Sequence, residues 1–337
     1  MSLVNAERRR LFKRRSTRLM LLIAVLIFGG VVTGFTVASH RNDADARATA
    51  VQRANEEYER QLGFHRQFVA QCKADKAAGV PQVKEMPEDC FESMGPTPDS
   101  FNPEWYMPYQ FNFRTDFPTM ISLFAGVMVL IAFVIGASYV GAEWNTGGMM
   151  NLLIWRPRRI PVLLTKLGTL VGGVLASGLG LAAAWTGAFW LIGKYDGTLG
   201  KLTAGAWRSF GLSGARALAL ALAFAVAGFA LASLGRHTAM ALGVAIGVAL
   251  GSEVGLRIAL EIIRVPFSSR YFLSTYAAAW MEKTLTFENW RACEFAMGQC
   301  QPQKLTITWQ HSAWLFGIAT LLLAGAALWA IRRRDVT

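Results

Sequence analysis

Residues 117–140 have the sequence FPTMISLFAGVMVLIAFVIGASYV, which contains no charged side chain. The hydrocarbon core of a bilayer is about 30 Å thick, and a helix needs about 20 mostly apolar residues to cross it. A run of this length and composition therefore predicts a membrane-spanning helix.

Comparable apolar runs occur elsewhere in the 337-residue chain, at 19–38, 160–192, 212–234, 238–263 and 309–331. The first is longer than the apolar part of a cleavable signal peptide, about 7–15 residues, so we expect a retained span. The run 160–192 exceeds one perpendicular crossing and predicts a helix that is tilted or that enters the membrane through an interfacial turn. The predicted fold class is an all-α polytopic membrane protein with six transmembrane helices.

The composition agrees with this class. Hydrophobic residues make up 53% of the chain and charged residues only 17%, whereas soluble domains carry about 25% charged residues. Such high hydrophobicity excludes intrinsic disorder. The low density of charge argues against a nucleic-acid-binding domain in spite of the net charge of +12, so we expect no nucleic-acid partner.

The basic residues predict the orientation. If the N-terminus is cytoplasmic, the inner segments carry the whole net charge of +12, and the outer segments contain equal numbers of acids and bases. Basic loops stay in the cytoplasm, so we expect cytoplasmic tails at 1–18 and 332–337. Large extracytoplasmic loops then follow the first and fifth helices, at 39–116 and 264–308. The expected location is the plasma membrane.

The four cysteines, Cys72, Cys90, Cys293 and Cys300, all lie in these two outer loops. Disulfides belong to oxidising compartments, and four cysteines permit three pairings. The simplest is local closure, Cys72 with Cys90 and Cys293 with Cys300. A zinc site is the weaker alternative, because the spacing is wide and no histidine lies close by in the sequence.

The first outer loop begins with a predicted helix. Apolar and weakly polar residues recur at alternating spacings of three and four, at Ala44, Ala48, Val51, Asn55, Tyr58, Leu62, His65, Val69 and Cys72. One stripe of this helix needs a partner. The partner is either another copy in a coiled-coil stalk or the remainder of the same loop. Short apolar helical stretches around 271–281 predict re-entrant or interfacial helices in the second large loop.

The chain has no phosphate-binding loop, no metal-ligand spacing and no nucleophile elbow. We therefore expect no enzyme activity in this chain alone. Within the fifth span, Glu253, Arg257 and Glu261 share one helix face, because they are spaced by four residues. They form either an intrahelical ion-pair ladder or a functional intramembrane group, and Glu253, nearest mid-span, is the better functional candidate.

The segment 141–159, GAEWNTGGMMNLLIWRPRR, follows the second span. It predicts a short amphipathic helix parallel to the membrane. The apolar side chains expected to face lipid or a partner groove are Trp144, Met149, Leu152, Leu153 and Trp155. On its own this pattern is more typical of an interfacial helix followed by orienting arginines than of a docking helix.

The run Glu143, Thr146-Gly147, Leu152-Leu153, Pro157-Arg158-Arg159 and Lys166-Leu167 resembles the cytoplasmic signature of ABC-2-type permeases, most closely the actinobacterial ones. One departure is that threonine precedes glycine, where the reverse order is usual. Leu231–Ala239 is also similar to that family's tight turn between its fourth and fifth spans.

The resemblance implies a type V exporter-like fold, in which two six-span permease subunits, identical or different, assemble with two separate ATPase subunits. ATP and Mg²⁺ would then bind to the ATPase and not to this chain. The loop after the second span would be a coupling helix that docks on the ATPase. The residues expected to make that contact are Glu143, Trp144, Thr146, Gly147, Leu152, Leu153, Pro157 and Arg159.

Two other functions fit the sequence. One is an ion-coupled secondary carrier that uses Glu253. The other is a non-transporting membrane scaffold or sensor whose outer loop binds a partner. Membrane lipids are expected to contact the chain in every case.

Overall fold

A computed structural model describes residues 3–83, 85–155, 159–290 and 301–333. Within them, six helical segments are long and apolar enough to cross a membrane. They are α2 (Arg15–Ala38), α4 (Phe113–Asn145), α6 (Arg159–Tyr195), α7 (Ala204–Gly235), the composite segment Thr238–Ile262, and α11 (Trp309–Arg333). The prediction of a helical polytopic membrane protein is confirmed at this level.

Several spans extend beyond the apolar runs that predicted them. The helix α7 begins at Ala204, because Thr203 caps it by accepting a hydrogen bond from the Ala206 amide. The helix α4 continues to Asn145. Hydropathy marks the part of a helix that lipid can cover, whereas a helix ends only where its backbone groups find other partners.

The composite span is not a continuous α-helix. It consists of α8 (Thr238–Val248), the π-helical segment η5 (Ala249–Leu256) and α9 (Arg257–Ile262). Only 6% of its apolar window is buried within the chain, compared with 61% for α4. Most residues of this span are therefore partly or largely exposed within the chain.

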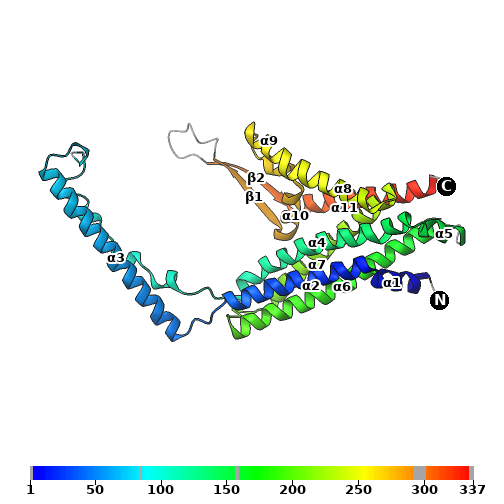
Figure 1. Ribbon diagram of the computed structural model, residues 1–337, viewed down its shortest axis with the longest axis horizontal. Helices are drawn as coiled ribbons and strands as arrows, with labels where there is room; N and C mark the ends of the chain where they lie inside the picture. Colours follow the sequence, from blue (N-terminus) through cyan, green and yellow to red (C-terminus); the bar gives the residue numbers. More distant parts are fainter. Residues whose placement is uncertain (1–2, 84, 156–158, 291–300, 334–337) are drawn as a thin grey trace. The chain divides into compact units, whose positions relative to one another are not determined.

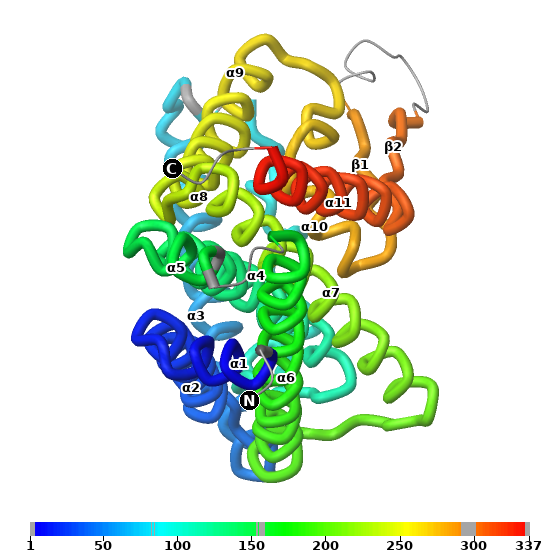
Figure 2. Tube along the Cα trace, turned by 90° about the vertical axis from the view of Figure 1, so that its right-hand side faces the viewer, coloured from blue at the N-terminus to red at the C-terminus, as the bar shows by residue number. Residues whose placement is uncertain are grey.

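The chain forms two compact units, one of residues 1–32, 114–189 and 201–337, and one of residues 33–113 and 190–200. In the first unit, α2, α4 and α6 meet through aromatic rings. Phe28 stacks on Phe124 at 5.0 Å between ring centroids and contacts Trp185 at 4.9 Å. Trp185 also donates its indole hydrogen to the Met120 carbonyl at 3.2 Å. Figure 1 and Figure 2 show these helices side by side.

The helices α4 and α7 approach through small residues. A side chain at Gly136 would collide with the backbone of Ala225, and one at Gly228 would collide with the backbone of Phe133. Small residues at such crossings let membrane helices pack closely enough for dispersion forces to hold them.

The helix α11 packs along α7, and α10 (Leu273–Glu282) lies against the start of α11. In the sequence between α10 and α11, β1 (Thr284–Asn289) and β2 (Gln303–Thr308) form an antiparallel pair of strands. Leu285 pairs with Ile307, and Phe287 pairs with Leu305. The hairpin was not predicted, and its cause is the alternation of apolar and polar residues in both strands. A short 3-10 helix, η6 (Ser268–Tyr271), precedes α10.

The second unit contains the long helix α3 (Ala44–Ala77), which Asp43 caps by accepting a hydrogen bond from the Ala46 amide at 2.9 Å. The chain then folds back along α3, as Figure 1 shows. The returning segment contains four short 3-10 helices, η1 (Pro81–Val83), η2 (Glu92–Met94), η3 (Pro98–Ser100) and η4 (Pro103–Tyr106).

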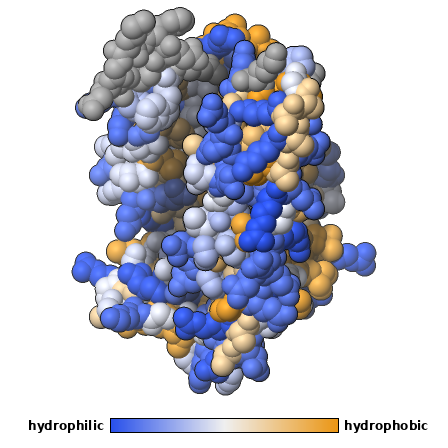
Figure 3. Space-filling model, turned by 90° about the vertical axis from the view of Figure 1, so that its left-hand side faces the viewer, coloured by the Kyte–Doolittle hydropathy of each residue, from blue (hydrophilic) through white to orange (hydrophobic). Residues whose placement is uncertain are grey.

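The returning segment supplies a partner for the second half of the predicted stripe of α3, from Tyr58 to Cys72, whereas Ala44, Ala48, Val51 and Asn55 are exposed. Val69 and Cys72 are buried against Cys90, and the ring of Tyr58 meets that of Phe101 at 5.8 Å between centroids. The predicted disulfide between Cys72 and Cys90 is confirmed. Within this chain the helix therefore packs on its own loop. The face of the molecule seen in Figure 3 is mainly hydrophilic.

The disulfide predicts a local change on reduction. In the double variant Cys72→Ser/Cys90→Ser, we expect the segment 79–106 to loosen from α3, because the closed loop of 18 residues contributes about 3 kcal/mol. Hydrogen exchange should then increase in the last turns of α3. A reductant should have no further effect on those turns in the double variant. Unchanged exchange would contradict the prediction.

Candidate functional site

A helix lies in the segment predicted only as a basic tail. The helix α1 spans Leu3–Lys13, directly before α2, and exposes most of its basic residues. Its inner face buries Glu7 and Leu11, which are one helical turn apart. Leu11 packs against Gly173 of α6, where a larger residue would collide with the leucine side chain. The tail is therefore docked on the helical bundle.

Beneath α1, the ammonium group of Lys166 is fully buried between two carboxylates. Its Nζ lies 2.8 Å from Oε2 of Glu7 and 2.6 Å from Oε2 of Glu143. The three residues come from α1, α6 and α4, so one buried cation joins three helices.

Two arginines complete what we call the charge cluster, which consists of Glu7, Arg10, Arg14, Tyr139, Glu143 and Lys166. Arg14 pairs with Glu143 at 2.6 Å and donates to the backbone carbonyls of Ser138 and Tyr139 at 3.0 and 2.6 Å. Arg10 pairs with Glu7 at 3.2 Å.

The Tyr139 hydroxyl donates to Oε2 of Glu7 at 2.7 Å. The Tyr139 ring also lies 5.4 Å from Nζ of Lys166 and 5.3 Å from the guanidinium of Arg14. An aromatic ring at such distances attracts both cations.

The acid–base balance of Glu7 follows from these contacts. Burial alone raises the pKa of Glu7, but the hydrogen bond and charge of Lys166, the Tyr139 hydroxyl and the charge of Arg10 together hold its pKa below the usual value of 4.5. Glu7 therefore stays ionised at neutral pH, and the pairing with Lys166 persists.

The cluster borders the short helix α5 (Gly148–Trp155). After α4 ends at Asn145, the chain turns at Gly147, whose φ of +70° favours glycine. A polar cleft of about 520 Å³ lies between the cluster and α5. It is lined by Arg10, Arg14, Glu143, Gly148, Asn151 and Leu152.

The surface of α5 differs in part from the predicted one. Met149 was expected to face lipid or a partner, but it is fully buried, because it lies on the side of α5 that contacts the bundle. Among the side chains of α5 that the structure describes, Met150 and Ile154 are apolar and exposed, and Ile154 is 75% exposed.

Trp144 points to a different element. The guanidinium of Arg236 lies 5.1 Å above its ring, and Arg236 adopts a left-handed conformation where α7 ends. The turn into α8 approaches α4 closely, since a side chain at Gly141 would collide with Thr238. Trp144 thus links the end of α4 to the α7–α8 turn.

The remaining predicted coupling residues lie around α5. The hydroxyl of Thr146 donates to the Ala142 carbonyl at 3.0 Å, Leu153 belongs to α5, and Arg159 begins α6. Pro157 lies outside the described residues, as do Cys293 and Cys300.

Of the predicted coupling residues, Glu143 and Leu152 thus line the cleft. Glu7 and Arg14 were not predicted as site residues. The sequence contains one indication of Glu7, because it is the only acid in residues 1–18.

Of the three charged residues in the fifth span, Glu253, Arg257 and Glu261, the first has a structural role. Glu253 accepts hydrogen bonds from the amide and the hydroxyl of Ser274, at the start of α10, and lies 3.6 Å from Arg257. The Arg257 guanidinium also lies 4.5 Å from the centroid of the Phe272 ring. Glu253 thus caps α10, while Glu261 lines a separate cleft with Arg264 and Phe287. The secondary-carrier hypothesis gains no support from these contacts.

In the described part of the chain, no group of three or more histidine, cysteine or acidic side chains could hold a metal ion. Comparison of the chain with protein-family models, with curated proteins and with solved structures gave no match. Fold and site together define a helical membrane protein whose N-terminal helix is fastened to the bundle by buried ion pairs. Its function is inferred from that geometry.

The buried ammonium predicts a large loss of stability on neutral replacement. Lys166→Met should lower the free energy of unfolding by about 3–5 kcal/mol, because it removes the fully buried cation that the carboxylates of Glu7 and Glu143 share. Thermal unfolding in detergent measures the loss. Lys13→Met removes an exposed lysine from α1 and should change little; equal effects of the two variants would contradict the burial argument.

The lowered pKa of Glu7 predicts an acid-sensitive attachment of α1. Ionised Glu7 contributes fully to stability above pH 4.5, which is the pKa of a glutamate in an unfolded chain. This contribution is lost as the pH falls through the lower pKa of Glu7 in the folded protein. We expect a stability profile from pH 6 down to pH 3 to show this loss. In Glu7→Gln the corresponding step should be absent; an unchanged profile would show that other carboxylates are responsible.

Proposed function

We propose that the chain is the membrane subunit of an ATP-binding-cassette exporter and works with a separate ATPase subunit. The single observation that carries the proposal is that the charge cluster ties α1, α4 and α6 together directly before α5. The resemblance of segment 141–167 to the ABC-2 permease signature supports the same conclusion.

The helix α5 has the features of a docking element. It is short, it is anchored on one side by the buried Met149, and it exposes the apolar Met150 and Ile154 on another. An exposed apolar surface on a helix at the end of a bundle suits a groove on a protein partner. The partner proposed here is the ATPase.

The charge cluster can transmit a movement of α5 to the spans. Glu143 lies at the end of α4, just before α5, and its carboxylate is bound to Lys166 of α6 and to Arg14, which joins α1 to α2. Breaking a buried ion pair costs about 3–5 kcal/mol, so these helices should move together when the ATPase displaces α5. Such rigid-body movement would switch the subunit between two states.

The chemistry of the chain agrees with ATP hydrolysis in a partner. No phosphate-binding loop occurs in the sequence, so ATP and Mg²⁺ would be held by the ATPase. The orientation in the membrane fits the same proposal. The elements α1, α5 and the end of α11 lie at one end of the first unit, and this end would face the cytoplasm, where the ATPase would bind.

The sparsely buried span supports a second permease subunit. Gly243, Gly247 and Gly251 follow one another every fourth residue, and a side chain at any of them would meet no atom within 4 Å. Glycines at this spacing favour close contact between membrane helices. We propose that this face meets the same span of another permease subunit, in a homo- or heterodimer.

Replacing Ile154 tests the ATPase contact. Ile154→Asp should abolish co-purification with the ATPase, because it places a charge on the apolar docking face, and it should leave thermal stability unchanged, because the side chain is exposed. The control is Val4→Asp, which changes an exposed residue of α1 at the same end. Ile154 is a sharper probe than Glu143, whose loss would also break the charge cluster.

Retention of the ATPase by Ile154→Asp would overturn the assignment of α5 as the coupling helix. ATP-independent transport by the isolated chain would instead favour a secondary carrier. If the chain neither associates with an ATPase nor transports anything, the scaffold hypothesis would be favoured.

A further inference from the structure

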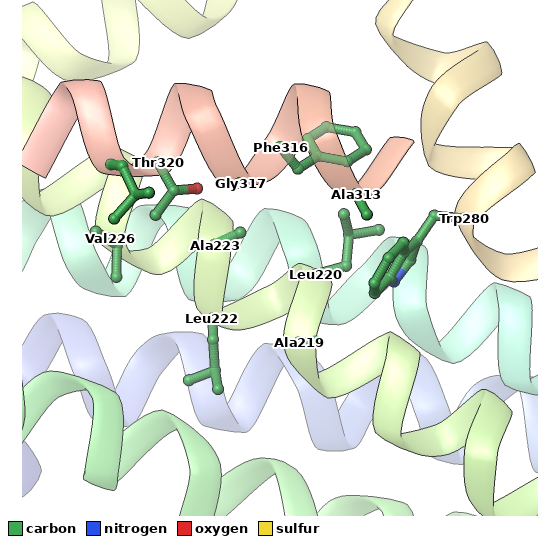
Figure 4. A pocket seen from close by; sticks show the side chains of 11 residues that line it. Ala219, Leu220, Leu222, Ala223, Val226, Trp280, Ala313, Phe316, Gly317 and Thr320 are labelled. Carbon is green, nitrogen blue, oxygen red and sulfur yellow. The ribbon is translucent and has the colours of Figure 1, made fainter. Parts of the chain in front are cut away.

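A cavity of about 390 Å³ lies between α7 and α11 in the first unit. Its walls are apolar, apart from the Thr320 hydroxyl. Figure 4 shows side chains of both helices facing this space, with Trp280 of α10 at one end. In a bundle that spans a membrane, such a space faces lipid chains.

A cation lies at the Trp280 end of this cavity. Trp280 donates its indole hydrogen to the Arg216 carbonyl at 2.8 Å, and the Arg216 guanidinium lies 5.5 Å from the centroid of the Trp309 ring. Arg216 shares a face of α7 with the cavity residues Ala219, Leu220 and Ala223. Arg216 thus lies at the Trp280 end of the apolar cavity.

The Arg216 guanidinium lacks an anionic partner among the described residues. Its Nη1 is buried, and among the described residues no acceptor reaches it. No described carboxylate forms an ion pair with Arg216, and Glu253, an acid of the neighbouring span, is already engaged by Ser274 and Arg257. A partly buried cation without a counter-ion is unfavourable, and the nearby aromatic ring offsets only part of that cost.

A second buried polar group lies on the facing helix. Ser312 of α11 is fully buried, and its hydroxyl has no hydrogen-bond partner in the described structure. It precedes the cavity residue Ala313 and lies one turn from Phe316. Two polar groups without partners thus occur close to the same end of one apolar cavity.

We infer that this cavity binds an anionic phospholipid, with one acyl chain between α7 and α11 and the phosphate on Arg216. The apolar walls exclude a free anion as the occupant, because a small ion would gain nothing from them. Tryptophans such as Trp280 and Trp309 prefer the headgroup level of a bilayer, which is where the lipid phosphate lies. An arginine can bind a phosphate through two parallel hydrogen bonds.

The chain offers a matched pair of glycines for the test. Gly317 lines the cavity, and Gly325 lies on the same helix outside the lining. A Cβ atom at either glycine would meet no atom within 4 Å. Gly317→Leu should therefore occupy part of the cavity, and Gly325→Leu adds the same volume elsewhere on α11.

The experiment measures lipid retained by the full chain. The protein is reconstituted in nanodiscs of equal parts phosphatidylglycerol and phosphatidylcholine, and native mass spectrometry counts the lipids that remain bound. The wild type should retain phosphatidylglycerol about tenfold over phosphatidylcholine, because the choline cation of phosphatidylcholine offsets the charge of its phosphate and weakens the contact with Arg216. Arg216→Gln should abolish this preference, and Arg216→Lys should keep part of it. Gly317→Leu should lose both lipids, and Gly325→Leu should match the wild type.

Three results would overturn the inference. They are equal retention of the two lipids by the wild type, an unchanged preference in Arg216→Gln, and unchanged retention in Gly317→Leu. Thermal unfolding of each variant verifies its fold, and if Arg216→Gln fails to fold, Arg216→Lys and the glycine pair decide the question. The result does not depend on the proposed transport function, because no ATPase is present.

Discussion

The burial of one ammonium group determines how one end of the helical bundle is assembled. Lys166 has no contact with solvent and needs carboxylates from two other helices, Glu7 of α1 and Glu143 of α4. Because an unpaired buried charge is so costly, α1 is held on the bundle and the end of α4 is held beside α6. The position of α5 follows, since only a short turn separates it from Glu143.

Small residues make that assembly possible. The leucine of α1 that accompanies Glu7 fits only because position 173 is glycine, and the α7–α8 turn approaches α4 only because position 141 is glycine. Glycine is otherwise unfavourable in helices. In a membrane, where lipid is as apolar as the side chains, close approach is a main source of helix association. Ion pairs and close approach thus act together at the same end of the bundle.

The spans could be predicted from the sequence because the bilayer imposes length and composition directly on each helix. The hairpin of β1 and β2 was missed, although the alternation around Leu285 and Phe287 indicates it. The signature loop directed attention to Glu143, but Glu7 and Lys166 meet Glu143 only in three dimensions, since more than a hundred residues separate Glu7 from the other two. Whether Ile154 or Met149 faces outward depends on how α5 rotates against the bundle, which a short apolar run does not determine.

Arg216 differs from the arginines of the charge cluster in how its charge is balanced. At the α5 end, Arg10 and Arg14 have carboxylate partners within the chain. At the α10 end, Arg216 has a tryptophan ring and an apolar cavity but no described carboxylate. A pairing that is complete within the chain holds helices together whatever surrounds them, whereas an incomplete one is satisfied only by a molecule from outside. The same residue type therefore serves cohesion at one end and, by our inference, lipid recognition at the other.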